Sequence, residues 1–192
     1  MQTPEAALTR LCTPEAEVSA HYLIAEDGRT WQLVDEEMRA WHAGAGQWGA
    51  ITDMNSRSVG IELANDGASP FPEPQMAALE ALLPDIMQRW DIAPERVIGH
   101  SDMAVGRKID PGPRFDWRRL ALSGLAVWPE TGRPGEFEAD ARRAGFAWAE
   151  GQEEALLNAV RLRLRPWGDG PLSDADRAAI AGLAARYPAA EA

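Results

Sequence analysis

Residues 99–113 read GHSDMAVGRKIDPGP and contain one of the three histidines of the chain, its only lysine and an Asp-Pro-Gly turn. The apolar residues 97–98 predict a short buried strand that ends at His100. Gly106 and the Asp-Pro-Gly turn predict a tight excursion of the chain, which can bring His100 and Asp110 to one point. Both side chains can bind zinc at about 2.0–2.2 Å, although catalytic zinc takes three protein ligands. The segment therefore predicts part of a metal site.

Composition limits the classes of function. With 192 residues, of which 45% are hydrophobic, the chain can bury a core as one domain with an appendage or as two small domains. The net charge of −11, without a basic cluster, argues against nucleic acid as a partner. The single cysteine, Cys12, excludes an intramolecular disulfide. No apolar run approaches the ~18–20 residues of a transmembrane segment, and the first residues of the given sequence do not show the basic-then-apolar pattern of a signal peptide.

The first two thirds of the chain predict a small α/β domain, residues 1–128. Asp27-Gly28 is a strong signal for a hairpin between two predicted strands. Pro84 lies within a predicted helix and should bend or split it. The predicted elements are a helix from residue 4 to about 11, strands at 20–25, 29–34 and 59–63, a helix at about 74–90, and a strand at about 96–99.

The last third predicts a separate helical module, residues 129–192. Two prolines and two glycines in residues 129–135 are typical of a linker. Three helical patterns follow, at 136–144, 152–164 and 173–186, and Ser173 is placed to cap the last of them.

Two charged side chains stand out in the predicted α/β domain. Glu62 lies in the middle of the apolar strand 59–63, where an unpaired carboxylate is costly to bury. It therefore faces either water at a sheet edge or a polar cleft. Lys108 is either a solvated loop side chain or, two residues from Asp110, a functional ammonium in a chain that otherwise uses arginine.

The remaining histidines allow several interpretations. For His21 and His42, a structural role with satisfied hydrogen bonds comes first, a place in a substrate groove second and metal binding third. Trp41 is expected to lie in the core or in a groove wall. The sequence contains no Ser/His/Asp triad motif and no glycine-rich phosphate loop.

The order of several motifs resembles a known family. These motifs are VSAHYLI and EDG from residue 18, AWHAG from 40, NSRSVGIEL from 55 and GHSDMAVGRKIDPGPRFDW from 99. They are similar to the zinc-dependent N-acetylmuramoyl-L-alanine amidases of the type-2 amidase fold, which also includes the peptidoglycan recognition proteins. The resemblance covers residues from about 18 to 120 and implies a small mixed central sheet with packed helices. RPW at 165–167 and GPLSDA at 170–175 resemble a small peptidoglycan-binding module appended to some of these amidases.

The resemblance implies roles for individual residues. His100 and Asp110 would bind Zn²⁺, Glu62 would be the general base, and Lys108 would face the developing oxyanion. The implied reaction is hydrolysis of the amide between N-acetylmuramic acid and L-alanine in peptidoglycan or muropeptides, by a monomer. The remaining implied residues would line the groove or order the metal ligands; they are His21, Trp41, His42 and Asn55.

The sequence also departs from this family. The family pattern opens with an apolar strand that ends in a histidine, the third zinc ligand, and Met1 aligns after that point. We expect a start assigned too far downstream; the alternatives are loss of the metal or substitution by another residue, of which His21 is the nearest. Without that strand, we predict poor folding or weak zinc binding, with little amidase activity.

Two other classes of function compete with the amidase. One is a non-catalytic binder of peptidoglycan that uses the same groove without metal. The other is a structural or interaction domain whose histidines are incidental. The compartment, cytoplasmic or periplasmic, stays open.

Overall fold

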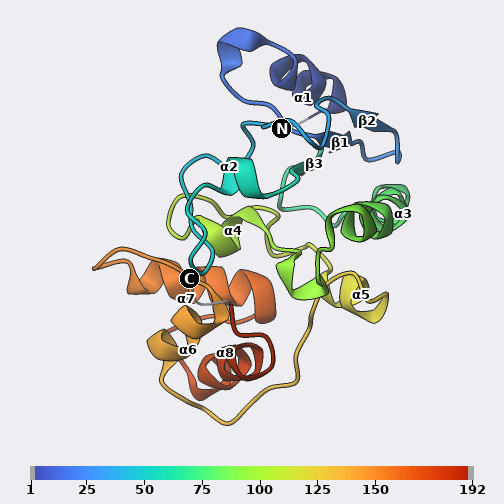
Figure 1. The fold of residues 1–192 in the computed structure, drawn as a ribbon. Helices are drawn as coiled ribbons and strands as arrows, with labels where there is room; N and C mark the ends of the chain where they lie inside the picture. Colours follow the sequence, from blue (N-terminus) through green and yellow to red (C-terminus); the bar gives the residue numbers. More distant parts are fainter. Residues whose placement is uncertain (1–2, 190–192) are drawn as a thin grey trace.

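The computed structural model describes residues 3–189 (Figure 1). Met1 and Gln2, where the sequence analysis places the junction with the family's first strand, lie outside them. A small sheet has the strand order β2-β1-β3, with β1 (Tyr22–Ile24), β2 (Thr30–Gln32) and β3 (Ile61–Leu63). Strand β1 is antiparallel to β2 and parallel to β3. The mixed α/β fold expected from the sequence is therefore confirmed.

The hairpin forms where the turn signal predicts it. Gly28 has φ +88°, a conformation that glycine adopts without steric cost. The Asp27 carboxylate accepts the Arg29 backbone N–H at 3.1 Å and closes the turn. Strand β1, the inner strand of the hairpin, is buried along its whole length, so both of its faces pack against other residues.

Two helices pack beside the sheet. Helix α1 (Pro4–Leu11) begins at the Thr3 N-cap, and α3 (Glu73–Trp90) is one helix with Pro84 inside it. The expected split at Pro84 does not occur, and the alternative, a bend, stays a prediction. Pro84 is exposed, so water can reach the carbonyl that loses its intrahelical donor. The buried Gln75 amide donates to Ile24 O at 2.9 Å and to Ala64 O at 3.1 Å, and so ties α3 to β1 and to the end of β3.

The predicted strand at 96–99 is wrong. Residues 94–96 form the 3-10 turn η2 (Pro94–Arg96), and His100 is the first residue of the short helix α4 (His100–Met103). A strand needs a neighbour for its backbone groups, whereas Val97 N–H donates locally to Pro94 O at 3.2 Å. Gly99 N–H likewise donates to the Asp102 carboxylate at 2.8 Å. Two other short helices, α2 (Met54–Arg57) and α5 (Trp117–Leu122), are not predicted by the sequence.

The three C-terminal helices form as predicted, and α7 packs against α4. They are α6 (Phe137–Ala144), α7 (Glu153–Leu164) and α8 (Asp174–Arg186). Figure 1 shows α4 between the sheet and these helices. One apolar core joins Trp48 and Met103 to Phe146 and Ile180, so both parts of the chain share it. Within residues 3–189, no helix is both long and apolar enough to cross a membrane.

Candidate metal centre and active site

The loop that begins at α4 brings His100 and Asp110 into direct contact. Ser101 N–H donates to Asp110 O at 2.9 Å, which holds the end of the loop against its beginning. The His100 Nδ1 atom then faces the Asp110 Oδ2 atom at hydrogen-bonding distance. This is the juxtaposition that the Asp-Pro-Gly turn predicts.

The second ring nitrogen of His100 fixes the chemistry of this contact. Nε2 lies 3.0 Å from the carbonyl oxygen of His42. A carbonyl only accepts, so Nε2 carries the proton and, in a neutral ring, Nδ1 presents its lone pair to Asp110. At this contact a shared proton lies between the two groups, and a metal ion bound by both would require them to move apart. The pair has the donor types of two zinc ligands.

The charges around the pair stabilise this arrangement. Burial by itself lowers the pKa of His100, but the hydrogen bond and charge of Asp110 and the charge of Glu62 outweigh it, so this pKa is raised. Burial by itself raises the pKa of Asp110, and the hydrogen bond and charge of His100, with Lys108, reverse this and lower it. The site therefore favours a carboxylate next to a positive partner.

Glu62 and Lys108 belong to the same cluster. Glu62 lies on β3 and is half-buried, and its charge acts on His100. Lys108 is also half-buried and acts on both His100 and Asp110. The charges of Glu62 and Lys108 thus act on the two residues that the family resemblance implies as metal ligands, and the roles of all four residues stay predictions.

The donor set is incomplete for catalytic zinc. Among the residues that the structure describes, no group of three His, Cys, Asp or Glu side chains is placed to hold a metal ion. His100 and Asp110 fit zinc in donor type, but they supply two of the three protein ligands that a catalytic zinc site takes.

His42 lies beside this centre as a neutral ring. Burial, followed by the charges of His21 and His100, lowers its pKa to about 4. Its Nε2 atom is buried and has no hydrogen-bond partner in residues 3–189. A Cβ atom on Gly60 would lie 2.2 Å from the His42 ring, so the backbone just before β3 approaches the ring as closely as only glycine permits.

Two of the implied groove residues are buried and bonded to backbone. His21 is 1% exposed; its Nδ1 accepts Gly60 N–H at 2.9 Å, and its Nε2 lies 3.0 Å from Met38 O. Asn55 is 7% exposed and accepts Ala43 N–H at 2.8 Å. Asn55 thus holds the loop just after His42, and His21 bonds to backbone at Met38 and Gly60. Their implied roles toward the substrate and the metal ligands stay predictions.

Trp41 is the implied groove residue that reaches the surface. Its ring is 57% exposed, and the guanidinium carbon of Arg39 lies 4.5 Å from the ring centroid. It is therefore not a core residue, and its place in a groove wall stays a prediction.

Sequence reasoning missed Arg107, which connects the two loops of the site. Its Nη2 donates to Ala43 O at 2.6 Å and also to Ala45 O. An arginine next to Lys108 in a polar loop resembles an ordinary solvated side chain, and its partners are 62 and 64 residues away. No local pattern could have indicated this role.

Comparison with known proteins gives the family. A family model described as N-acetylmuramoyl-L-alanine amidase matches residues 1–113. The N-acetylmuramoyl-L-alanine amidase AmiD of Escherichia coli (strain K12) is 36% identical over 189 residues, covering 90% of this chain and 58% of AmiD. The 1,6-anhydro-N-acetylmuramyl-L-alanine amidase AmpD of Haemophilus influenzae is 41% identical over 107 residues, covering 55% of this chain and 58% of AmpD. The chain thus spans less than two thirds of either relative.

Two solved structures superpose on nearly the whole of this chain. The complex of E. coli AmiD with anhydro-N-acetylmuramic acid-L-Ala-D-gamma-Glu-L-Lys superposes with a TM-score of 0.86 at 32% identity, covering 95% of this chain and 84% of that one. AmpDH3 from Pseudomonas aeruginosa in complex with anhydromuramic pentapeptide gives 0.85 at 32% identity, covering 96% and 88%. Because the family model spans more than half of its residues, the chain belongs to the N-acetylmuramoyl-L-alanine amidase family.

Proposed function

We propose that this protein hydrolyses the amide bond between N-acetylmuramic acid and L-alanine in muropeptides. The observation that carries the proposal is the contact between His100 Nδ1 and Asp110 Oδ2, on which the charges of Glu62 and Lys108 act. The relatives support it: AmiD and AmpD are named amidases of this bond, and both complexes described above contain anhydromuramyl peptides.

Each residue of the site has a defined part in this proposal. His100 and Asp110 would hold Zn²⁺, which when bound polarises the substrate carbonyl and lowers the pKa of water. Glu62 takes the proton of the attacking water and passes it to the leaving nitrogen of L-alanine, a contribution of about 10²–10⁴ in rate. The Lys108 ammonium stabilises the negative oxygen of the tetrahedral intermediate. The His42 carbonyl keeps His100 in the tautomer that directs Nδ1 toward Asp110.

A second candidate is a muropeptide-binding protein without catalysis. It is favoured by one observation, that the described part of the chain places no three metal-binding side chains together. Such a protein would keep the affinity for muropeptide and would lack turnover.

We also propose that the C-terminal helices bind peptidoglycan. The domain boundary between residues 128 and 129 stays a prediction. Trp167, in the RPW motif, supports this role because its ring is 69% exposed. An exposed aromatic face of this kind can stack on a sugar ring.

The variant E62Q tests the catalytic proposal. With zinc present, we expect cleavage of anhydro-N-acetylmuramyl tetrapeptide to fall about 10²–10⁴-fold, because the general base is lost, while the affinity for the peptide changes little. Mass spectrometry of the products and calorimetry measure the two quantities. The matched control is E138Q, on the exposed face of α6. Equal cleavage by E62Q and E138Q contradicts the role of Glu62, and binding without cleavage by the wild type selects the second candidate.

A further inference from the structure

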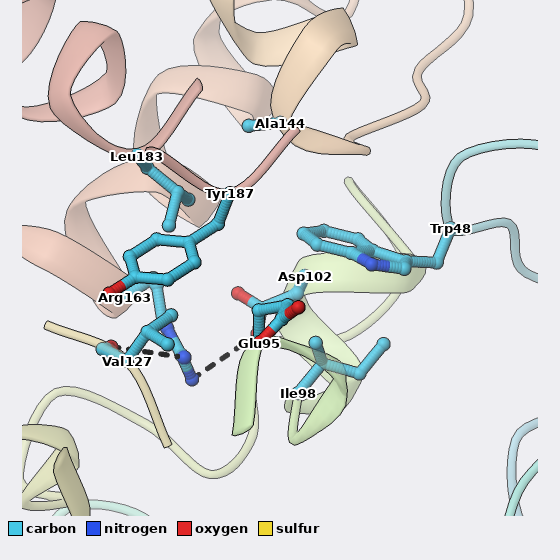
Figure 2. A pocket seen from close by; sticks show the side chains of 9 residues that line it. All are labelled: Trp48, Glu95, Ile98, Asp102, Val127, Ala144, Arg163, Leu183 and Tyr187. Carbon is cyan, nitrogen blue, oxygen red and sulfur yellow. Dashed lines mark hydrogen bonds and ion pairs between the residues drawn. The ribbon is translucent and has the colours of Figure 1, made fainter. Parts of the chain in front are cut away.

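A buried ion pair joins α4 to the C-terminal helices. Asp102 on α4 is 1% exposed and Arg163 on α7 is 3% exposed. Arg163 Nη1 lies 3.8 Å from Asp102 Oδ2. Figure 2 shows the Arg163 side chain reaching from α7 toward Val127 and Asp102, with the Tyr187 ring beside it.

Asp102 holds the turn that begins at His100. The same Oδ2 atom accepts Gly99 N–H at 2.8 Å, directly before His100. The neighbouring Ser101 N–H donates to Asp110 O at 2.9 Å. A displacement of Asp102 would therefore move the backbone that positions both candidate metal ligands, His100 and Asp110.

Arg163 and Asp102 depend on each other for charge compensation. In residues 3–189, neither has a second ion-pair partner. The Arg163 guanidinium carbon lies 3.6 Å from the Trp117 ring centroid, and Nη2 donates to Val127 O at 3.4 Å. Asp102 Oδ1 and Arg163 Nη1 lack hydrogen-bond partners in the described chain. The pair lines a cavity of about 10 Å³ together with apolar side chains, Tyr187 and the half-buried Glu95. Because neither group has a second ion-pair partner in the described chain, removing one charge leaves the other without its partner.

We propose that Arg163 is a positioning residue for the metal centre, acting through Asp102 on the first turn of α4. The C-terminal helices thereby contribute to the geometry of His100 as well as to any binding of the wall. The functional consequence rests on the proposed amidase site, whereas the structural coupling can be measured without it. Residues that orient metal ligands in this way change metal affinity by about 10- to 100-fold when replaced.

Hydrogen exchange of the full-length chain tests the structural coupling. In R163M, we expect peptides that cover residues 97–112 to exchange faster than in the wild type, because the uncompensated Asp102 carboxylate draws in water and releases Gly99 N–H. The matched control is R161M, two residues earlier on α7. Arg161 pairs with Asp176 at 2.8 Å inside the C-terminal helices. R161M should therefore loosen α7 and α8 and leave residues 97–112 protected.

A double variant distinguishes the effect of an uncompensated buried charge from the effect of lost side-chain packing. In D102N/R163M the asparagine keeps an oxygen that can accept Gly99 N–H, and no charge is buried alone. We expect it to restore protection of residues 97–112 toward the wild-type level, even where R163M alone does not fold. R163K, which keeps the charge, should give intermediate protection. A double variant that folds no better and protects no more than R163M overturns the proposal, as does equal deprotection by R161M.

Zinc titration supplies the functional readout. For the wild type and R161M we expect the same dissociation constant, and for R163M one about 10- to 100-fold higher. If R163M deprotects residues 97–112 but the wild type binds no zinc, the positioning role stands and the amidase proposal fails. If the wild type binds zinc and R163M changes neither exchange nor affinity, the positioning role fails and the amidase proposal stands.

Discussion

At the scale of single residues, backbone carbonyls and amides decide how the site is arranged. The His42 carbonyl selects the tautomer of His100, and the Asn55 amide oxygen holds the loop just after His42. Buried polar atoms of this kind contribute most to the stability of the fold when their partner would otherwise be left without a hydrogen bond.

The variant N55A tests this ordering role. Because Ala43 N–H is buried and would lose its acceptor, we expect the free energy of unfolding to fall by about 1–3 kcal/mol. Urea denaturation measures the change. The matched control is Q47A on the same loop, whose amide bonds Gly49 O in an exposed position; its effect should stay within about 0.5 kcal/mol. Equal effects of the two variants contradict the role of Asn55.

The sequence predicted which residues lie at the candidate site, but it did not predict the residues that hold them in place. His100 and Asp110 are joined by a local turn, which is visible in the spacing of glycine and proline. Arg107 and Asp102 act through partners about 60 residues away, on loops or helices whose approach no local pattern encodes.

At the scale of elements, the Glu36 carboxylate joins the segment after β2 to the end of α3, and we call this set of contacts the Glu36 clamp. Glu36 accepts Arg89 Nε at 3.0 Å, Trp90 Nε1 at 2.5 Å and the Tyr22 hydroxyl at 2.6 Å. Its side chain is 7% exposed. These donors, with Arg89 first, lower the pKa of Glu36 to about 2, and burial next to Glu36 raises the pKa of Tyr22 to about 12.

This clamp predicts a dependence of stability on pH. The pKa of Glu36 falls from an ordinary 4.5 to about 2, so the folded state keeps the carboxylate while the unfolded state takes up a proton. The stabilisation is complete above about pH 4.5 and is lost as the pH falls toward 2. The stability difference between the wild type and E36Q should therefore shrink over that range, as measured by urea denaturation at pH 7, 4 and 3. A difference that stays constant contradicts the clamp.

Long or strongly signalled elements could be predicted, and short ones could not. The hairpin at Asp27-Gly28 and the helices α6–α8 follow from turn chemistry and helical spacing. Residues 97–99 have the apolar character of a strand, but their amides find local acceptors instead of a neighbouring strand. Helix α4 has four residues, too few for a periodic pattern.

At the scale of the whole molecule, the C-terminal helices share a core with the part that carries the site. Trp48 stacks edge to face on Phe146, with ring centroids 5.2 Å apart, and Leu156 and Ile180 are fully buried in the same core. Deleting these helices would expose this core, so a point variant is the sounder test of wall binding.

The variant W167A provides this test. We expect weaker sedimentation with insoluble peptidoglycan sacculi, because an exposed aromatic ring is lost, and unchanged thermal stability. The matched control is L122A, which removes an exposed apolar side chain from α5. Unchanged sedimentation of W167A, or an equal loss in L122A, would count against wall binding through Trp167.

Calorimetric titration of Zn²⁺ into the wild-type chain of 192 residues, H100Q and D110N tests whether His100 and Asp110 bind a metal ion. We expect one zinc ion per wild-type chain, bound more weakly than at a site with three protein ligands, and loss of that binding in both variants. Wild-type protein that binds no zinc, or variants that bind it as tightly as the wild type, would contradict the claim that His100 and Asp110 share a cation.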